Sequence, residues 1–449
     1  MNAKPSMHES LLIENATLLS TGGVPSVRRN HSILIKDGLI ARVAPGGRIG
    51  AFSGRRIDAT GKVVVPGLIN AHTHLYSAFA RGMMRVRPAH DFVAVLRNLW
   101  WRLDCALTTE DCYYSALVGL IEAIRHGTTT LIDHHASPHA VAGSLDAIAR
   151  AVGETGLRAC LCYEVSDRDG ARAARESLDE NSRFIRRCQT HGDSNLRALF
   201  GLHASFTLSD GTLEEAASLG HALGVGFHIH AAESLADQQA TLRAAKTSVI
   251  GRLGKLGILG RRSIAAHCVH VSQREMDTLA ETGTAVAHNP QSNLNNAVGT
   301  ANVVEMARRG TVVGLGTDAM TENMLEELRS ALWAQRAESR NPSVGFKEVT
   351  SALFDGNPRI ASRVFGLRFG ELRRGCVGDV AIFDYDPPTP LVSENALGHV
   401  LAGLSQARVD TTVVGGRVLM EHEKLMIDVD EERANARARE LARNLWQRT

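Results

Sequence analysis

From residue 63 onward, short apolar runs alternate with longer segments whose apolar residues recur at i, i+3, i+4 and i+7. The runs carry few polar interruptions, which is typical of strands buried on both faces of a parallel sheet. Eight of them fall at residues 63–74, 128–135, 157–165, 196–207, 224–233, 263–270, 284–293 and 311–320. The clearest helical segments lie at 109–127, 213–224 and 325–338. Eight strand–helix units over about 260 residues predict an α/β fold, a (β/α)8 TIM barrel.

The two ends of the chain have a different pattern, with alternating residues and glycine turns instead of long helices. We expect residues 10–62 and 375–425 to form one small β-sandwich-like domain beside the barrel. A last segment, 428–446, has the spacing of an amphipathic helix. The predicted organisation is therefore residues 1–62 for the first part of the β domain, 63–370 for the barrel, and 371–449 for the rest of the β domain with the terminal helix.

Composition narrows the class of protein. The chain has 449 residues, a formal net charge of +2 and no block of basic residues, so we expect neither nucleic acid nor membrane as a partner. The amino terminus does not resemble a signal peptide, and no run reaches the length of about 18 apolar residues that a spanning helix needs. Seven cysteines without a disulfide pattern indicate a reduced, cytoplasmic protein. We expect a small-molecule substrate and a homo-oligomer, a dimer.

The first apolar run ends in a metal-ligand pattern. His72 and His74 are two residues apart, so they point to the same side of a strand. Two buried imidazoles side by side need partners for their nitrogens, and a metal ion would supply one. His230 ends the fifth run, and Asp318 ends the eighth, which neighbours the first in a closed barrel. Three imidazoles and a carboxylate suit Zn²⁺, with Fe²⁺ as the alternative.

The number of metal ions also follows from the chain. Some barrel hydrolases bridge two metal ions with a carbamylated lysine. Between Lys62 and Lys246 the chain contains no lysine, so the first five strands cannot provide one. We therefore predict one divalent metal ion, bound by His72, His74, His230 and Asp318.

The same strand ends carry groups for proton transfer. A bound metal would lower the pKa of its water toward about 7, which makes hydroxide available for attack. Glu233 lies three residues beyond His230, close enough to move a proton without being a ligand. His267, on the next run, can orient the attacking water, and Asp318 can accept its first proton. We predict Glu233, His267 and Asp318 as the catalytic residues.

The substrate pocket is less determined by the pattern. Arg81 follows the histidine pair, and we predict that it contacts the substrate, with a solvated or structural arginine as the alternative. Trp100 and Trp101 can stack on a flat ring or pack on a helix face. His134 and His135 end the second run, and only one of them can face inward.

The motifs PGLINAHTH, HAAE, AHCVH, NPQSN and GTD resemble those of the amidohydrolase superfamily, over nearly the whole chain. The most similar branch contains adenosine-type and S-adenosylhomocysteine deaminases, guanine and cytosine deaminases, and triazine hydrolases. The segments NLWWRLD and IDHHASP are similar to the SsnA group of aminohydrolases associated with selenium metabolism. By this resemblance, the four ligands named above bind metal, Glu233 protonates the substrate nitrogen, His267 holds the hydroxide, and His203 contacts the substrate.

The resemblance implies an aminohydrolase that adds hydroxide to a C=N carbon of a small nitrogen heterocycle and releases ammonia. Two alternatives stay open at this point. The first is a hydrolase with another leaving group, such as chloride or an amide. The second is a non-catalytic accessory protein of selenium metabolism, although such relatives typically lose ligands.

Overall fold

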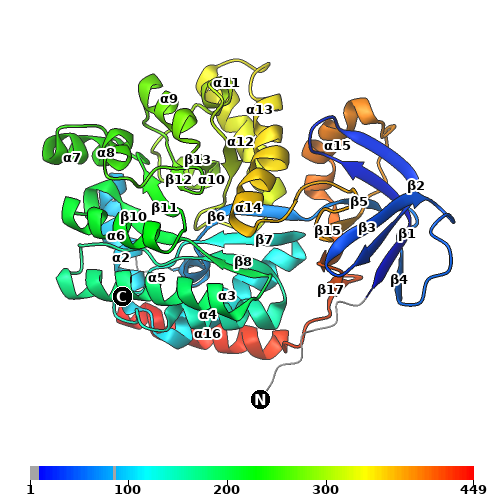
Figure 1. The fold of residues 1–449 in the computed structure, drawn as a ribbon, viewed down its shortest axis with the longest axis horizontal. Coiled ribbons are helices and arrows are strands. Elements are labelled where there is room, and N and C mark those ends of the chain that lie inside the picture. Colours follow the sequence, from blue (N-terminus) through cyan, green and yellow to red (C-terminus); the bar gives the residue numbers. More distant parts are fainter. Residues whose placement is uncertain (1–9, 84–86) are drawn as a thin grey trace.

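The structure, a computed structural model, describes residues 10–83 and 87–449. It has two parts, a barrel of parallel strands surrounded by helices and a sheet to one side of the barrel (Figure 1). Among the described residues, no helix is both long enough and apolar enough to cross a lipid bilayer.

The barrel strands follow the eight predicted runs. They are β6 (Leu68–Thr73), β7 (Thr128–Asp133), β8 (Arg158–Leu161), β9 (Leu196–Ala198), β10 (Phe200–Ala204), β11 (Phe227–Ala231), β12 (Ile264–His267), β13 (Ala285–His288) and β14 (Val313–Leu315). Neighbours pair in parallel from β6 to β9 and from β10 to β14. Single bridges, Val165 to Leu202 and Thr73 to Asp318, join these two sets on both sides. The predicted barrel fold is thereby confirmed.

Two predicted strands are broken in the structure. The run 196–207 is divided at Leu199, because β9 pairs with β8 whereas β10 pairs with β11. The run 63–74 is divided at Gly67. Its first half, β5 (Val63–Pro66), pairs with strands of the side sheet, so the sheet extends beyond the boundary expected at residue 62.

The side sheet combines both ends of the chain. Its members are β1 (Leu11–Ser20), β2 (Ser26–Lys36), β3 (Leu39–Pro45), β4 (Arg55–Asp58), β5, β15 (Val380–Asp384), β16 (Arg408–Val414), β17 (Arg417–Glu421) and β18 (Lys424–Leu425). The antiparallel pairing of β5 with β15 joins the amino-terminal strands to the carboxyl-terminal ones. All nine strands belong to one continuous sheet that both ends of the chain form. The expected division of the chain into domains stays a prediction.

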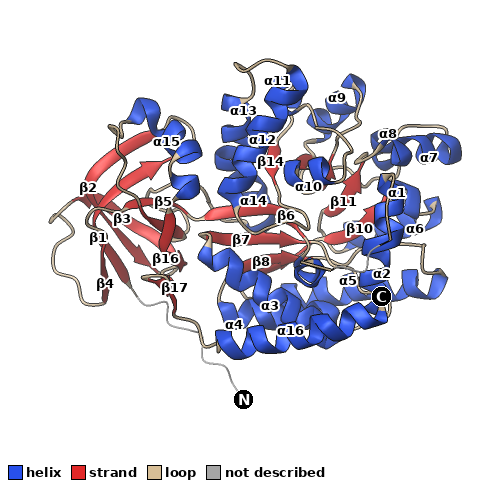
Figure 2. Cartoon of the chain, turned by 180° about the vertical axis from the view of Figure 1, so that it is seen from behind, coloured by secondary structure: helices blue, strands red, loops and turns tan. Residues whose placement is uncertain are grey.

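Helices cover the outside of the barrel (Figure 2). They are α3 (Thr109–Arg125), α4 (Ser144–Thr155), α5 (Ala171–His191), α6 (Asp210–Ala222), α7 (Leu235–Ala245), α8 (Val249–Lys255), α9 (Gln273–Thr282), α10 (Pro290–Asn295), α11 (Val303–Arg308), α12 (Met324–Ser339), α13 (Phe346–Ser351) and α14 (Asn357–Phe365). Before α3, the chain forms the 3-10 turn η1 (Leu75–Ala80), then α1 (Phe92–Val95), the π-helical turn η2 (Leu96–Trp100) and α2 (Trp101–Ala106). The remaining helices are α15 (Ala396–Ala402) and α16 (Glu431–Arg448).

The terminal helix α16 packs on helices of the barrel. It lies along α3 (Figure 1). Leu445 is fully buried there, and the indole Nε1 of Trp446 donates to the carbonyl of Phe79 at 2.7 Å. The helix thus supports η1, the segment that follows the histidine pair.

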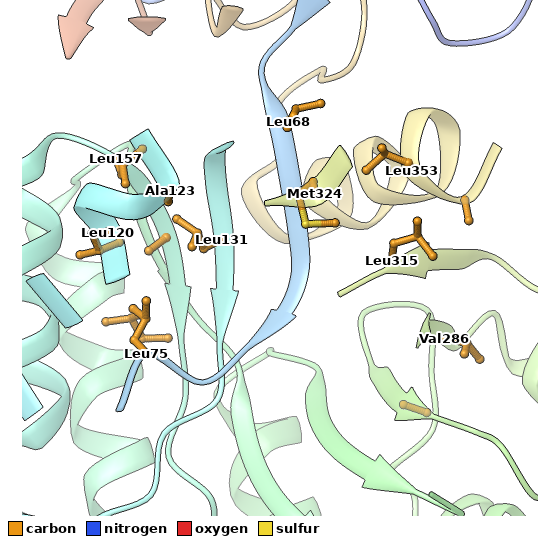
Figure 3. Close-up of a cluster of buried hydrophobic side chains, with 14 of the residues drawn as sticks. Leu68, Leu75, Leu120, Ala123, Leu131, Leu157, Val286, Leu315, Met324 and Leu353 are labelled. Atoms are coloured by element: carbon orange, nitrogen blue, oxygen red, sulfur yellow. The ribbon is translucent and has the colours of Figure 1, made fainter. Parts of the chain in front are cut away.

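The apolar side chains form two layers around the strands. Outward-facing residues pack against the helices, and Figure 3 shows Leu131 of β7 beside Leu120 and Ala123 of α3. A separate cluster, which includes Ile69, Ile132 and Ile264 from the barrel strands, packs with Ile360 and Phe365 of α14. These layers keep apolar packing away from the carboxyl ends of the strands, where the polar residues gather.

Candidate active site

The carboxyl ends of β6 and β14 are joined through the backbone. The amide N–H groups of Thr317 and Asp318 both donate to the carbonyl of His72 at 2.9 Å. The amide of His74 in turn donates to the carbonyl of Asp318 at 3.3 Å. Closure of the barrel therefore places the carboxylate of Asp318 directly beside the two histidines.

Three imidazoles converge on this carboxylate. The Nε2 atom of His74 lies 2.9 Å from Asp318 Oδ1 and 3.2 Å from His230 Nε2. His72 Nε2 lies 3.5 Å from the same oxygen, is buried, and has no hydrogen-bond partner among the described residues. Several acceptor nitrogens directed at one buried point, with a carboxylate beside them, fit a divalent metal ion.

Each of these rings is held from behind through its Nδ1 atom. His74 Nδ1 donates to the carbonyl of His134 at 2.5 Å, and His230 Nδ1 donates to the carbonyl of His203 at 2.9 Å. His72 Nδ1 lies 2.9 Å from His228 Nε2. Such contacts fix the tautomer and leave Nε2 free for a metal ion. His228 thus supports the ring of His72.

The backbone is strained where the functional side chains emerge. His267 has φ +72° and Asp318 has φ +53°, in the left-handed region that non-glycine residues rarely occupy. Gly316, just before Asp318, faces His72 so closely that a Cβ atom there would lie 2.7 Å from the carbonyl oxygen of His72. Only glycine fits at this point, which explains the GTD motif physically.

Glu233 and His267 stand beside the converging nitrogens. His267 Nε2 lies 3.6 Å from Glu233 Oε2 and 4.0 Å from Asp318 Oδ2. Its Nδ1 receives a hydrogen bond from the side-chain amide of Asn293 at 2.8 Å, so Nε2 carries the hydrogen of the neutral ring. This N–H is buried and has no partner in the described part of the chain, so it is available to a bound water or substrate.

Burial and neighbouring charges shift the pKa values of Glu233 and Asp318 in opposite directions. Burial, with the charge of Asp318 adding to it, raises the pKa of Glu233 well above its ordinary value. Burial acts to raise the pKa of Asp318 as well, but the neighbouring imidazoles of His72 and His74 hold it well below its ordinary value. Burial also lowers the pKa of His267 to about 4. The pKa values of the two carboxyl groups are therefore shifted in opposite directions, a pattern typical of acid–base catalysis.

Helix α10, formed by the NPQSN segment, contacts three site residues. Besides Asn293, Ser292 donates to Asp318 Oδ2, and the Asn296 side-chain amide donates to Glu233 Oε1 at 3.3 Å. The segment therefore shapes the site through direct side-chain contacts.

A cavity opens above these groups, and several predicted pocket residues line it. His203 is among them, as are Trp100 and Trp101, which both face the cavity from the helix that contains the π turn η2. His134 is buried beside His230, with ring centroids 4.7 Å apart, whereas His135 turns away toward Ser137. The inward residue of this pair is therefore His134.

Arg81 lies outside the cavity that His203 lines, but it lines a neighbouring pocket together with His74 and Asp318. Contact of Arg81 with the substrate stays a prediction. Its guanidinium is exposed and pairs with Glu122 of α3 at 2.7 Å. The 3-10 turn η1 after His74 carries it away from the cavity that His203 lines, which spacing along the chain did not predict.

The cavity residues that the sequence analysis missed include the charged side chains of Asp104, Glu164 and Arg168. Arg168 pairs with Asp104 and with Asp169, the latter at 2.8 Å. Burial acts to raise the pKa of Glu164, but neighbouring imidazoles, His134 first, hold it well below its ordinary value. The signal that could have found Glu164 is its position at the end of the third apolar run, where the barrel fold places functional residues.

Comparison with known proteins defines the class. The model of the amidohydrolase family matches residues 63–419. A 5-methylthioadenosine/S-adenosylhomocysteine deaminase from Pelotomaculum thermopropionicum is 31% identical over 98% of this chain and 99% of its own. A 5'-deoxyadenosine deaminase from Methanothermobacter thermautotrophicus is 32% identical over 97% of this chain and 99% of its own.

Solved structures of similar proteins share the fold of this chain. A zinc-bound adenosine deaminase from Xanthomonas campestris superimposes with a TM-score of 0.84 at 22% identity, over 98% of this chain and 99% of that one. An atrazine chlorohydrolase from Arthrobacter aurescens, complexed with zinc, gives 0.82 at 24% identity, over 96% and 100%. The chain belongs to the amidohydrolase family. The narrower likeness to the SsnA group stays a prediction.

Proposed function

We propose that this chain is a metal-dependent aminohydrolase that deaminates a small amino-substituted nitrogen heterocycle and releases ammonia. The observation that carries the proposal is the convergence of three imidazole nitrogens on Asp318, with Glu233 and His267 beside them. The relatives named as deaminases of adenosine derivatives support an adenosine-type ring as the first substrate class.

We propose His72, His74, His230 and Asp318 as the metal ligands and Zn²⁺ as the ion, because borderline-soft imidazole and carboxylate donors suit it. When bound, the ion supplies a water whose pKa is lowered toward about 7. The predicted homodimer and cytoplasmic location remain predictions.

Residues of the chain then carry out the proton transfers. Asp318 accepts a proton from the attacking water, and His267 Nε2–H orients that water toward the ring carbon. Glu233, protonated because of its raised pKa, donates to the ring nitrogen next to that carbon. A C–O bond forms and the C–N bond to the amino group breaks. Ammonia leaves with the proton first taken from water. The remaining hydroxyl proton returns to Glu233, and the ring retains a carbonyl group.

An ammonia-release assay on the zinc-loaded protein tests the proposal. The panel contains adenosine, 5'-deoxyadenosine, 5'-methylthioadenosine, an amino-substituted pterin, an aminopyrimidine and a guanidino compound. We expect ammonia from at least one amino-substituted ring. A folded, metal-loaded protein that releases none would contradict the proposal. A chlorotriazine with chloride detection is included because the alternative leaving group would appear there.

A further inference from the structure

The carboxylate of Glu164 has no assigned role in the site described above. It lies in the same cavity as the other acidic residues: Asp104, Glu233, Asp237 and Asp318. Those four are engaged by Arg168, by Asn296, by the backbone N–H of Ala232 and by Ser292, respectively. Glu164 Oε1 is buried and lies 3.2 Å from His134 Nδ1, but it accepts no hydrogen bond from the described residues.

The second oxygen of Glu164 lies across a small space from His203. Oε2 is 3.8 Å from His203 Nε2, which is beyond hydrogen-bond length. Both side chains line the cavity and are nearly inaccessible from outside, with side-chain exposures of 4% and 8%. A group placed between these two atoms would contact both of them.

The hydrogen-bond pattern defines what His203 presents to this space. The Thr207 hydroxyl donates to the carbonyl of Ala204 at 3.0 Å, so its oxygen is left to accept from His203 Nδ1–H at 2.7 Å. A neutral imidazole with its hydrogen on Nδ1 has a bare Nε2, which is an acceptor. Glu164 Oε2 and His203 Nε2 are therefore two acceptors that face each other without a donor.

We infer that Glu164 Oε2 and His203 Nε2 form a two-acceptor subsite that binds a pair of hydrogen-bond donors on the substrate, apart from the amino group that leaves. This inference rests on the proposed function in one respect, because it takes the ligand of the subsite to be the substrate of the enzyme. The donors belong either to a second amino group on the ring or to a vicinal diol on an attached sugar. Buried acceptors without donors are unfavourable, so a substrate that fills them gains affinity over one that does not.

The charges around the subsite favour the same class of ligand. Arg168, the cationic side chain that lines the cavity, is already neutralised by Asp104 and Asp169. An anionic group beside Glu164 would meet like charge without a free counter-charge. The subsite therefore favours substrates whose hydrogen-bond donors are neutral or cationic.

Binding to the metal-loaded Glu233→Gln variant, which is expected not to turn over, tests the inference by calorimetry. Two ligand pairs separate the two donor sources: 2,6-diaminopurine against adenine, and adenosine against 2',3'-dideoxyadenosine. In at least one pair we expect the donor-bearing ligand to bind about 10-fold more tightly. Adding Glu164→Gln should reduce that ratio to less than about 3, with little change for the donor-poor ligand.

Glu214→Gln, on the exposed face of α6, is the matched control and should leave both ratios unchanged. A ratio that survives Glu164→Gln in both pairs would overturn the inference. So would the loss of a second metal ion per chain on that substitution, because Glu164 would then be a ligand. Ammonia release is measured separately, so failure of the proposed deamination does not decide this binding ratio.

Discussion

Asn293 acts through another residue, because its amide holds the ring of His267 by a bond of 2.8 Å to Nδ1. Asn293→Ala frees the ring to rotate and to exchange tautomers. Loss of such supporting bonds typically costs about 10- to 100-fold in activity. We expect kcat to fall by that amount while metal content, measured by elemental analysis, stays constant.

The neighbouring Asn295 is the control for this substitution. It lies on the same helix but is exposed, so Asn295→Ala should change kcat less than about twofold. Equal losses in both variants would mean that helix α10 as a whole, and not the bond to His267, is responsible.

Glu322 is a buried carboxyl group whose protonation is set by its neighbours. Burial raises its pKa to about 8. Thr73 can donate its one hydroxyl hydrogen to the carbonyl of Asp318 at 3.2 Å, and then accepts from a protonated Glu322 at 2.8 Å. The Asn70 amide donates to the other oxygen of Glu322 at 3.0 Å. A protonated carboxyl group satisfies all of these bonds.

This raised pKa predicts a pH dependence of stability. Between the unfolded pKa of about 4.5 and the folded value of about 8, the folded state holds one more proton. The contribution of Glu322 to the free energy of unfolding therefore falls as pH rises, by up to about 1.4 kcal/mol per pH unit. Glu322→Gln keeps the bonds without titrating. In urea titrations at several pH values, the free energy of unfolding of the variant should increase relative to that of the wild type as pH rises. A difference in this free energy that stays constant with pH would contradict the prediction.

At the scale of elements, an ion pair beneath the barrel connects it to the side sheet. Arg158 of β8 and Asp379, just before β15, are both buried and lie 3.3 Å apart. Asp379 also accepts from the amide of Gly415 at 2.8 Å, and its carbonyl accepts from Gly67 at 2.9 Å. The pair therefore holds the crossing point where the chain leaves the sheet and enters the barrel.

Removing one partner should leave an uncompensated buried charge. We expect Arg158→Ala to lower the free energy of unfolding by about 3–5 kcal/mol in urea titrations. Arg172→Ala is the control, because Arg172 on α5 is 92% exposed and pairs with Glu176 only at 3.8 Å. Its cost should stay below about 1 kcal/mol. A similar small cost for both would show that the buried pair does not hold the crossing point.

The periodicity of apolar residues predicted the strands and helices better than it predicted the breaks within the strands. The eight runs were readable because buried parallel strands are continuously apolar. The breaks at Gly67 and Leu199 were not, because they depend on which neighbouring strand offers hydrogen bonds. The path after His74 was also missed, since η1 and the π turn η2 are set by tertiary packing. That path takes Arg81 out of the cavity and puts Trp100 into it.

At the scale of the whole molecule, barrel closure explains why distant residues could be assigned together. His72 and Asp318 are far apart in the chain, but the first and eighth strands must meet. Strand-end position therefore predicted the grouping of the four candidate ligands, while their metal binding stays a proposal. Strand-end position could also have marked Glu164 as a site residue. The contacts of Glu164 and of the supporting His228 could not be predicted in this way, because they depend on side-chain direction and hydrogen-bond partners.

The central claim is that the strand-end constellation is a metal-dependent hydrolytic site with Glu233 as its proton donor. The most direct measurement combines metal content and ammonia release in wild type and Glu233→Gln. We predict about one divalent ion per chain in both proteins, with ammonia released by the wild type and turnover lowered by about 10²- to 10⁴-fold in the variant. A wild type that binds no metal ion, or a variant that keeps wild-type turnover, would contradict the claim.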